Sequence, residues 1–254
     1  MKTFVLSFTA AFGFLTRLAP PRIYDDKVFA ATIGWFPLVG FVLGTLLTAP
    51  FALGVLRGQP WIQAWLLLGG SLALTRGLHW DGWADLFDGW GSNAQGQRFW
   101  DIVKDSRTGA FGVIALVMGL SGQLLLLHQA LAAEAYTAVA FAFILGRSLA
   151  ACTAFCGRSL VRAGNGKLFL AGATVPVILL VIAQTLFAAL FVIPPITIIP
   201  TLCLCLLGLV ELVTLARRNE GMNGDFLGAA VIWGEISALL GWCIAANMNL
   251  PLLP

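Results

Sequence analysis

Apolar residues fill most of the chain in long blocks that short polar segments separate. Seven blocks are long enough to cross a bilayer, since a spanning helix needs about 20 mostly apolar residues. They cover residues 29–56, 60–80, 109–128, 136–156, 173–193, 196–216 and 226–247. Pro37 and Pro50 predict a tilted or kinked first helix. The pattern predicts an all-α, polytopic integral membrane helical bundle with about seven transmembrane helices.

The chain begins with a shorter apolar segment, MKTFVLSFTAAFGFLTRLAPP, which superficially resembles a secretory signal. Arg17 follows its apolar part, and no small-x-small cleavage site does. We therefore interpret it as a retained N-terminal helix, interfacial or half-inserted. No repeat or soluble linker interrupts the rest of the chain, which predicts a single membrane domain over residues 1–254.

Composition supports the membrane assignment and excludes several other classes. Hydrophobic residues make up 59% of the 254 residues and charged residues 11%, more apolar surface than a soluble domain of this size could bury. The formal net charge is only +3 and no basic tract is present, which argues against a nucleic-acid partner. All five cysteines lie in apolar runs without metal-ligand spacing, so we interpret them as small buried hydrophobes.

Basic residues predict the orientation in the membrane. If the N-terminus is cytoplasmic, residues 17–28, 81–108, 157–172 and 217–225 lie inside and hold most of the Lys and Arg, whereas Arg57 lies outside. Because Lys and Arg favour the cytoplasmic side, we expect this orientation in the inner membrane. The same side then carries the aspartates of the polar segments that follow the second span: Asp81, Asp85, Asp88, Asp101, Asp105 and Asp225. We therefore expect an active site on the cytoplasmic face.

The stretch LTRGLHWDGWADLFDGWG contains Asp81, Asp85 and Asp88, spaced four and three residues apart. If the second spanning helix continues through them, they share one helix face. Like charges on one face repel one another unless a cation lies between them, and Mg²⁺ is usually held by a few carboxylates plus substrate phosphates. The stretch predicts a metal site for a phosphorylated substrate. The alternative is a solvated helix end at the membrane boundary, with interfacial tryptophans between the acids.

The next polar segment, RFWDIVKDSRTGAFG, places Lys104, Ser106 and Arg107 around Asp105. Lys and Arg beside carboxylates suit a phosphate that is bridged to a metal. The alternative is an ordinary charged loop with helical ion pairs. Together with the first acidic stretch, the segment favours a metal and phosphate site.

Arg147 lies inside an apolar run and needs a partner, for which a substrate phosphate or one of the aspartates is the functional interpretation. The alternative is a snorkelling side chain. Arg76 lies just before the aspartates and raises the same question. His79 could serve as a base, but a packed histidine at a helix end is the simpler interpretation.

The last polar segment, RRNEGMNGDFLGAAVIWGE, contains Asn223, Gly224 and Asp225 at the start of an apolar helix. A glycine-rich turn that opens a helix can offer backbone N–H groups to an anion. Asp225 could join the metal site or orient a hydroxyl, and the alternative is a turn with Asp225 as the helix N-cap. Glu235 falls within the last span, where we expect it to be buried.

Four stretches carry a family resemblance: FLTRLAPP, GLHWDGWADLFDG, KDSRTGAFG and NGDFLGA…GE occur in this order. From about residue 8 to residue 240 the chain resembles the cobalamin 5′-phosphate synthases, also called adenosylcobinamide-GDP ribazoletransferases. The resemblance implies a multi-pass inner-membrane enzyme that requires Mg²⁺. It would join adenosylcobinamide-GDP to α-ribazole or its 5′-phosphate and release GMP, in the assembly of the cobalamin nucleotide loop.

The resemblance and the chemistry together assign roles to the motif residues. We expect Mg²⁺ on Asp81, Asp85, Asp88 and Asp105, with Asp88 or Asp105 as the catalytic base. Substrate phosphates would bind Lys104, Ser106, Arg107 and Arg147. The residues expected to bind or orient substrate are Arg76, His79, Asn223, Gly224, Asp225 and Glu235. The apolar body of the corrinoid would rest on Trp80, Trp83, Trp90 and Trp100 in the interface.

Partners and rival functions complete the expectations. The lipid bilayer is one partner, and a homo-oligomer or association with other cobalamin-assembly enzymes is compatible with the sequence. One rival is a membrane transferase like the CDP-alcohol phosphotransferases, with a lipid acceptor and a similar use of clustered aspartates. A transporter would instead place acids across several spans, whereas only Glu211 and Glu235 lie within the predicted ones.

Overall fold

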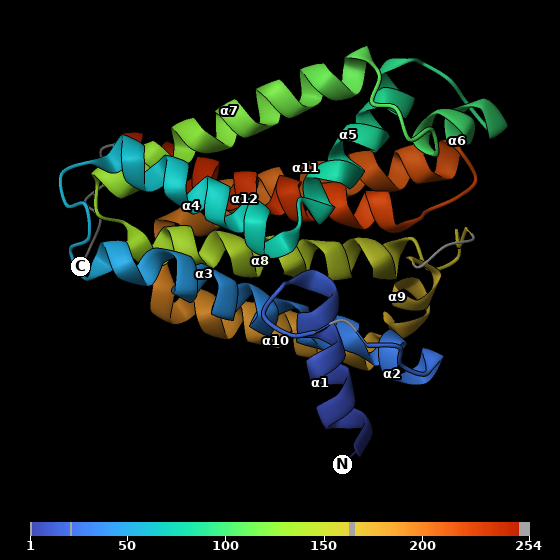
Figure 1. Ribbon diagram of the computed structural model, residues 1–254, viewed down its shortest axis with the longest axis horizontal. Coiled ribbons are helices and arrows are strands. Elements are labelled where there is room, and N and C mark those ends of the chain that lie inside the picture. Colours follow the sequence, from blue (N-terminus) through green and yellow to red (C-terminus); the bar gives the residue numbers. More distant parts are fainter. Residues whose placement is uncertain (1, 21, 163–165, 249–254) are drawn as a thin grey trace.

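The computed structural model describes residues 2–20, 22–162 and 166–248, which form a bundle of helices (Figure 1). The described residues form no strand, apart from one isolated bridge between Val161 and Met222. The elements are α1 (Lys2–Leu15), α2 (Asp26–Ala30), η1 (Ala31–Trp35), α3 (Phe36–Ala52), α4 (Pro60–Thr75), α5 (Leu78–Gly91), α6 (Gln97–Val103), α7 (Ala110–Ala132), α8 (Tyr136–Cys156), α9 (Gly166–Gly172), α10 (Val175–Val192), η2 (Pro195–Thr197), α11 (Ile198–Arg218) and α12 (Gly224–Asn247). The all-α prediction is confirmed.

Five helical segments of the described chain are long and apolar enough to cross a membrane. They are Asp26–Ala52, Ala110–Ala132, Tyr136–Cys156, Pro195–Arg218 and Gly224–Asn247. A sixth is reached if α9 and α10, which meet at 89°, form one broken span. The polytopic membrane bundle with a short N-terminal helix is confirmed, with five to six candidate spans in the described residues instead of about seven. The interfacial placement of α1 stays a prediction.

The run expected over residues 60–80 does not form one spanning helix. α4 has 16 residues and ends at Thr75, because Arg76 and Gly77 adopt left-handed backbone conformations with φ of +58° and +66°. The Gly77 N–H donates to the Leu72 carbonyl (2.9 Å), the usual way in which a glycine closes a helix end. The second predicted span therefore does not continue through the aspartates, the condition on which their shared helix face was argued. A separate helix, α5, carries all three.

Glycines let the central helices approach closely. A Cβ atom on Gly40 of α3 would lie 2.8 Å from the Cα of Ile144 in α8. On the other side of α8, a Cβ on Gly234 of α12 would lie 2.7 Å from the Cα of Gly146. Small residues at such crossings allow backbones to pack in direct contact where apolar burial alone gives little driving force. α8 is thereby held between α3 and α12.

Several connections between helices gather at one end of the bundle, where α6, α9 and the start of α12 lie together (Figure 1). The N–H of Gly96 and the indole of Trp100 donate to the side chain and carbonyl of Asn219, at 3.1 and 2.8 Å. Arg162 donates to Gln97 at 2.9 Å. The distribution of Lys and Arg in the sequence predicted that these connections lie on the same side of the membrane, and their grouping agrees with that prediction. Their cytoplasmic location stays a prediction.

Candidate active site

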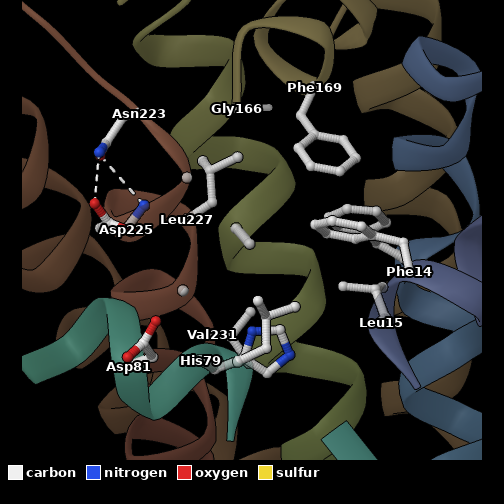
Figure 2. Close-up of a pocket in the computed structure, with 15 residues that line it drawn as sticks. Phe14, Leu15, His79, Asp81, Gly166, Phe169, Asn223, Asp225, Leu227 and Val231 are labelled. Carbon is white, nitrogen blue, oxygen red and sulfur yellow. Dashed lines mark hydrogen bonds between the residues drawn. The ribbon is translucent and has the colours of Figure 1, made fainter. Parts of the chain in front are cut away.

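A pocket of about 280 Å³ lies between α1, α3, α5, α8, α9 and α12 (Figure 2). One wall carries two carboxylates, Asp81 and Asp225. The opposite wall is aromatic and consists of Phe14, Phe36 and Phe169. Six segments that are distant in sequence therefore combine a charged surface and an aromatic surface in one cavity.

Close packing of α5 on α12 creates the acidic wall. A Cβ atom on Gly82 would lie 2.8 Å from the Cα of Asp225, so the two helices touch backbone to backbone there. Gly82 is the neighbour of Asp81, and the charge of Asp225 is close enough to act on Asp85. The helix crossing therefore brings together three carboxylates from two helices.

The electrostatics of this group are unusual. Burial, and then the charges of Asp81, Asp225 and Asp88, raise the pKa of Asp85 from 3.8 to about 7. Within the described residues, the carboxylates of Asp81 and Asp85 accept no hydrogen bond and form no ion pair. Repelling carboxylates without a cationic partner are suited to a bound cation.

We tested whether these residues fit Mg²⁺. In the described part of the chain, no three His, Cys, Asp or Glu side chains form a group that could hold a metal ion by themselves. Mg²⁺ commonly takes only one or two carboxylates, and substrate phosphates and water complete its ligands. Asp81 and Asp85, which have no other partner, fit that incomplete ligand set. The magnesium requirement itself stays a proposal.

Asp88 has a structural task. It is buried, and its two oxygens accept the backbone N–H groups of Gly109 and Gly112 at 2.6 and 2.7 Å. These groups belong to the first turn of α7, where N–H groups lack helical partners and a negative charge is stabilising. Since both oxygens are engaged, the geometry disfavours Asp88 as the base. The expected face of three equivalent aspartates divides into two without a hydrogen-bond partner among the described residues, Asp81 and Asp85, and one that caps α7.

The Lys104–Arg107 segment lies beyond the other end of α5. Arg107 pairs with Asp105 at 2.8 Å, and its hydrogen bonds lower the pKa of Asp105 to about 2. A carboxylate of such low basicity is a poor proton acceptor at neutral pH, so Asp105 is also disfavoured as the base. Lys104 and Ser106 are exposed. The segment is attached to α5 through Asp88, and none of its residues lines the pocket.

Arg147 lies deep inside the bundle and forms an ion pair with Glu235. Gln123 of α7 donates to the other oxygen of Glu235 at 2.7 Å. The partner of Arg147 is therefore Glu235 and not one of the aspartates, and its burial excludes the snorkelling alternative. The expected contact of Arg147 with a substrate phosphate stays a prediction. The pair joins α8 and α12, and Gln123 adds α7. The expected burial of Glu235 is confirmed, but its partner makes it a structural group.

Arg76 has protein partners, whereas His79 lies where both interpretations place it, packed near the start of α5 and beside the pocket. The Arg76 guanidinium donates to the carbonyls of Gly13 and Phe14, at 3.2 and 2.5 Å, at the end of α1. It therefore orients α1, and through it the pocket wall, instead of the substrate. His79 is buried beside the pocket, and its Nε2 has no hydrogen-bond partner. Burial, and then the Arg147 charge, lower the pKa of His79 well below its usual value, so the ring is neutral.

The turn before α12 presents Asp225 to the pocket. Asn223 is the N-cap: its Oδ1 accepts the Asp225 N–H at 3.2 Å, and its Nδ2 donates to Asp225 Oδ2 at 2.5 Å (Figure 2). The alternative in which Asp225 itself caps the helix is wrong. Asp225 Oδ1 accepts no hydrogen bond from the described residues. Asn223 and Gly224 also line the pocket, as their assignment to the substrate site predicts.

Sequence reasoning missed the aromatic wall, because Phe14, Phe36 and Phe169 have no distinctive spacing. It also missed Gln123, although a polar residue within an apolar run is a signal for a buried partner. The expected corrinoid surface is largely wrong. Trp80, Trp83 and Trp100 are buried in the bundle, and of the four tryptophans in that surface only Trp90 is exposed.

Comparisons with known proteins agree with the motif resemblance. The sequence model of the family described as "Cobalamin-5-phosphate synthase" matches residues 7–243. The chain is similar to the adenosylcobinamide-GDP ribazoletransferase of Nitratidesulfovibrio vulgaris, with 46% identity over 92% of this chain and 93% of the relative. Proteins of the same name from Brevibacillus brevis and Klebsiella pneumoniae are each 33% identical, over 92% and 93% of this chain and 96% and 98% of their own lengths. No solved structure matches. The chain therefore belongs to the cobalamin-5-phosphate synthase family.

Proposed function

We propose that this protein is an adenosylcobinamide-GDP ribazoletransferase, which joins adenosylcobinamide-GDP to α-ribazole or its 5′-phosphate and releases GMP. Membership of the family and the names of the relatives support the activity. The structural observation that carries the proposal is the pair of unpartnered carboxylates on α5. Asp81 lines a nucleoside-sized pocket, and Asp85 lies about one helical turn further along the helix. The lipid-acceptor alternative has no support from these relatives, which are all named ribazoletransferases.

The reaction exchanges one phosphate ester bond for another. A ribose hydroxyl of α-ribazole attacks the phosphorus that carries the cobinamide, the bond to the GMP oxygen breaks, and the hydroxyl loses its proton. Negative charge grows on the phosphate oxygens, so positioning and electrostatic stabilisation provide most of the catalysis. Mg²⁺, when bound, would neutralise this charge and the leaving GMP.

The side chains of the chain divide this work. Asp81 and Asp85 would hold the cation, which also relieves their mutual repulsion. Asp225 is best placed to take the proton of the acceptor hydroxyl, because Asn223 holds one of its oxygens and leaves the other open to the pocket. Lys104 and Arg107 are exposed in the adjacent segment, where they could contact the outer phosphate oxygens of the donor.

We further place the protein in the inner (cytoplasmic) membrane, with its N-terminus and site on the cytoplasmic side. The excess of Lys and Arg in the connections at the site end of the bundle supports this orientation. A homo-oligomer or a complex with other cobalamin-assembly enzymes stays a prediction.

The test is GMP release by the purified protein in nanodiscs, with adenosylcobinamide-GDP and α-ribazole 5′-phosphate in Mg²⁺ or EDTA. We expect GMP only when both substrates and Mg²⁺ are present. Asp85→Asn should be inactive, whereas the matched control Asp101→Asn, an exposed aspartate hydrogen-bonded to Gln97 on α6, should keep full activity. A folded protein that releases no GMP under these conditions would refute the proposal.

A further inference from the structure

The pocket has two chemically distinct ends. At the apolar end, the ring centroids of Phe14 and Phe169 are 4.9 Å apart, and those of Phe36 and Phe169 are 5.5 Å apart. Leu15 follows Phe14 in α1, and neither it nor the three phenylalanines has a polar side chain. The buried ring of His79 also lines the pocket and is, among the described residues, its one polar side chain besides Asn223, Asp225 and Asp81. At the other end, Asn223, Asp225 and Asp81 bring amide and carboxylate oxygens to the cavity (Figure 2). The ligand that fits combines an aromatic, nearly apolar part with a hydroxylated part.

The size of the cavity restricts the choice among the substrate parts. Its volume of about 280 Å³ is near the lower limit for small-molecule sites, which suits a nucleoside and excludes a complete corrin ring with its side chains. Two nucleosides take part in the proposed reaction, the guanosine of the donor and the α-ribazole acceptor. The aromatic end of the pocket distinguishes between them.

Guanine carries a polar edge of one carbonyl, one ring N–H and one amino group, which would lose their hydrogen bonds with water at the apolar end. A buried polar group without a partner is costly. The benzimidazole of α-ribazole has an apolar benzo edge and only one free ring nitrogen. It can stack on phenylalanine rings with no polar group to satisfy there.

We propose that this pocket is the acceptor site, with the benzimidazole base of α-ribazole against Phe14 and Phe169 and its ribose toward Asn223 and Asp225. The inference rests on the proposed function, because it assigns one substrate of that reaction, α-ribazole, to this pocket. In this orientation a ribose hydroxyl lies beside the open oxygen of Asp225. The corrinoid and guanosine parts of the donor remain outside the pocket, on the side of Asp85 and the Lys104–Arg107 segment.

Phe14 and Phe29 provide a matched pair of test positions. Both are half-buried and both pack on Phe169, with Phe14 at 4.9 Å and Phe29 at 5.0 Å between ring centroids. Only Phe14 of these two lines the pocket. Phe14→Leu should raise the KM for α-ribazole about tenfold, because base stacking on aromatic rings contributes strongly to binding. Phe29→Leu should leave this KM unchanged, and neither variant should change the KM for adenosylcobinamide-GDP.

A direct binding measurement separates this inference from the proposed activity. Equilibrium dialysis of radiolabelled α-ribazole, without corrinoid and in EDTA, should show binding to the wild type that excess unlabelled guanosine does not displace. Ala150→Leu, which adds bulk to the pocket lining, should abolish this binding without loss of thermal stability, and it provides a second test if Phe14→Leu does not fold.

The outcomes are distinct. Equal KM changes in Phe14→Leu and Phe29→Leu, displacement by guanosine, or a change in the donor KM alone would overturn the acceptor site in an enzyme that still releases GMP. Binding of α-ribazole that depends on Phe14, in a protein that releases no GMP, would support the site and refute the activity.

Discussion

The Arg147–Glu235 pair and the Asp81–Asp85 pair are both charged groups in a largely apolar bundle, and they differ in how their charge is balanced. Arg147 and Glu235 have opposite signs, come from α8 and α12, and are 1% and 4% exposed. Asp81 and Asp85 have the same sign, lie on one helix, and have no cationic partner among the described residues. The first pair stabilises contacts between helices. The second leaves a negative charge for a ligand to balance.

Asp88 is an intermediate case on the same helix as the unbalanced pair. The α7 N-terminus balances its charge by two N–H groups and by the helix dipole. The comparison therefore teaches that a carboxylate motif on one helix of a membrane protein cannot be assigned a single function. The partner that each side chain meets decides whether it supports the fold or awaits a substrate.

The largest effect should follow from breaking the buried pair. Arg147→Met leaves Glu235 without its counter-charge, and we expect it to lower the free energy of unfolding by about 3–5 kcal/mol. Denaturation in mixed micelles would measure this loss. The control is Arg57→Met, which breaks the exposed pair with Glu134 (3.3 Å) and should have no measurable effect. If Arg147→Met and Arg57→Met lowered the free energy of unfolding equally, the buried ion pair would not have the stabilising role assigned to it here.

The opposite pattern is expected at the unbalanced pair. Asp85→Asn should lower kcat/KM by about 100-fold, because it removes a carboxylate from the proposed cation site. Its melting temperature should stay the same or rise, since one repelling charge is lost. Calorimetry and GMP release on the same preparation would measure both. A large loss of stability in Asp85→Asn would show that this carboxylate belongs to the structural class.

Asp88→Asn should lie between these extremes. The amide keeps one acceptor oxygen but loses the charge and one hydrogen bond to α7, at an expected cost of about 1–3 kcal/mol. The Mg²⁺ concentration for half-maximal activity should remain that of the wild type. Thermal unfolding and a Mg²⁺ titration would measure the two quantities. If Asp88→Asn kept the melting temperature of the wild type but needed more Mg²⁺ for half-maximal activity, Asp88 would be a metal ligand and not a structural group.

The smallest effect concerns pH. Because the pKa of Asp85 is raised in the folded protein from 3.8 to about 7, its contribution to stability is fully present below about pH 4 and is lost as the pH rises through 7. In EDTA, the melting temperature of the wild type should therefore fall over this range relative to that of Asp85→Asn. Added Mg²⁺ should reduce the difference at high pH. Parallel curves for the two proteins in EDTA would contradict the raised pKa.

The helical membrane class could be predicted from the sequence, because apolar length is a local feature, and so could the grouping of Asp81, Asp85 and Asp88 on one helix. The sequence did not predict the division of the three aspartates. A shared helix face was the right expectation, but Asp81 and Asp88 are seven positions apart, or about 10 Å along the axis. That distance is enough for the two side chains to meet different neighbours, Asp225 of α12 and the start of α7.

The partners of Arg147 and the aromatic wall could not be predicted for a related reason. Arg147 and Glu235 are separated by 88 residues, and no local pattern couples them. The sequence pattern around Phe14 predicts a helix at the periphery of the bundle. Phe14 reaches the pocket only because α1 packs beside α9. Features that depend on tertiary contacts between distant apolar segments leave no periodic signal in a sequence that is apolar almost throughout.

The two hydrogen bonds that Asp88 accepts from Gly109 and Gly112 also affect where the chain tolerates insertions. Asp88 accepts hydrogen bonds from backbone groups 21 and 24 residues further along the chain. Residues 89–108, which include α6, therefore form a loop whose two ends are held together at this carboxylate. Lengthening a loop whose ends are held in this way costs little free energy, because closure entropy grows only slowly with loop length. Extra residues near Asn93 or Gln95 should therefore be accepted. A single residue inserted between Gly109 and Gly112 would move one of these two N–H groups away from Asp88. The α6 segment would then be held only by its contacts with the rest of the bundle, such as the hydrogen bonds of Gly96 and Trp100 to Asn219.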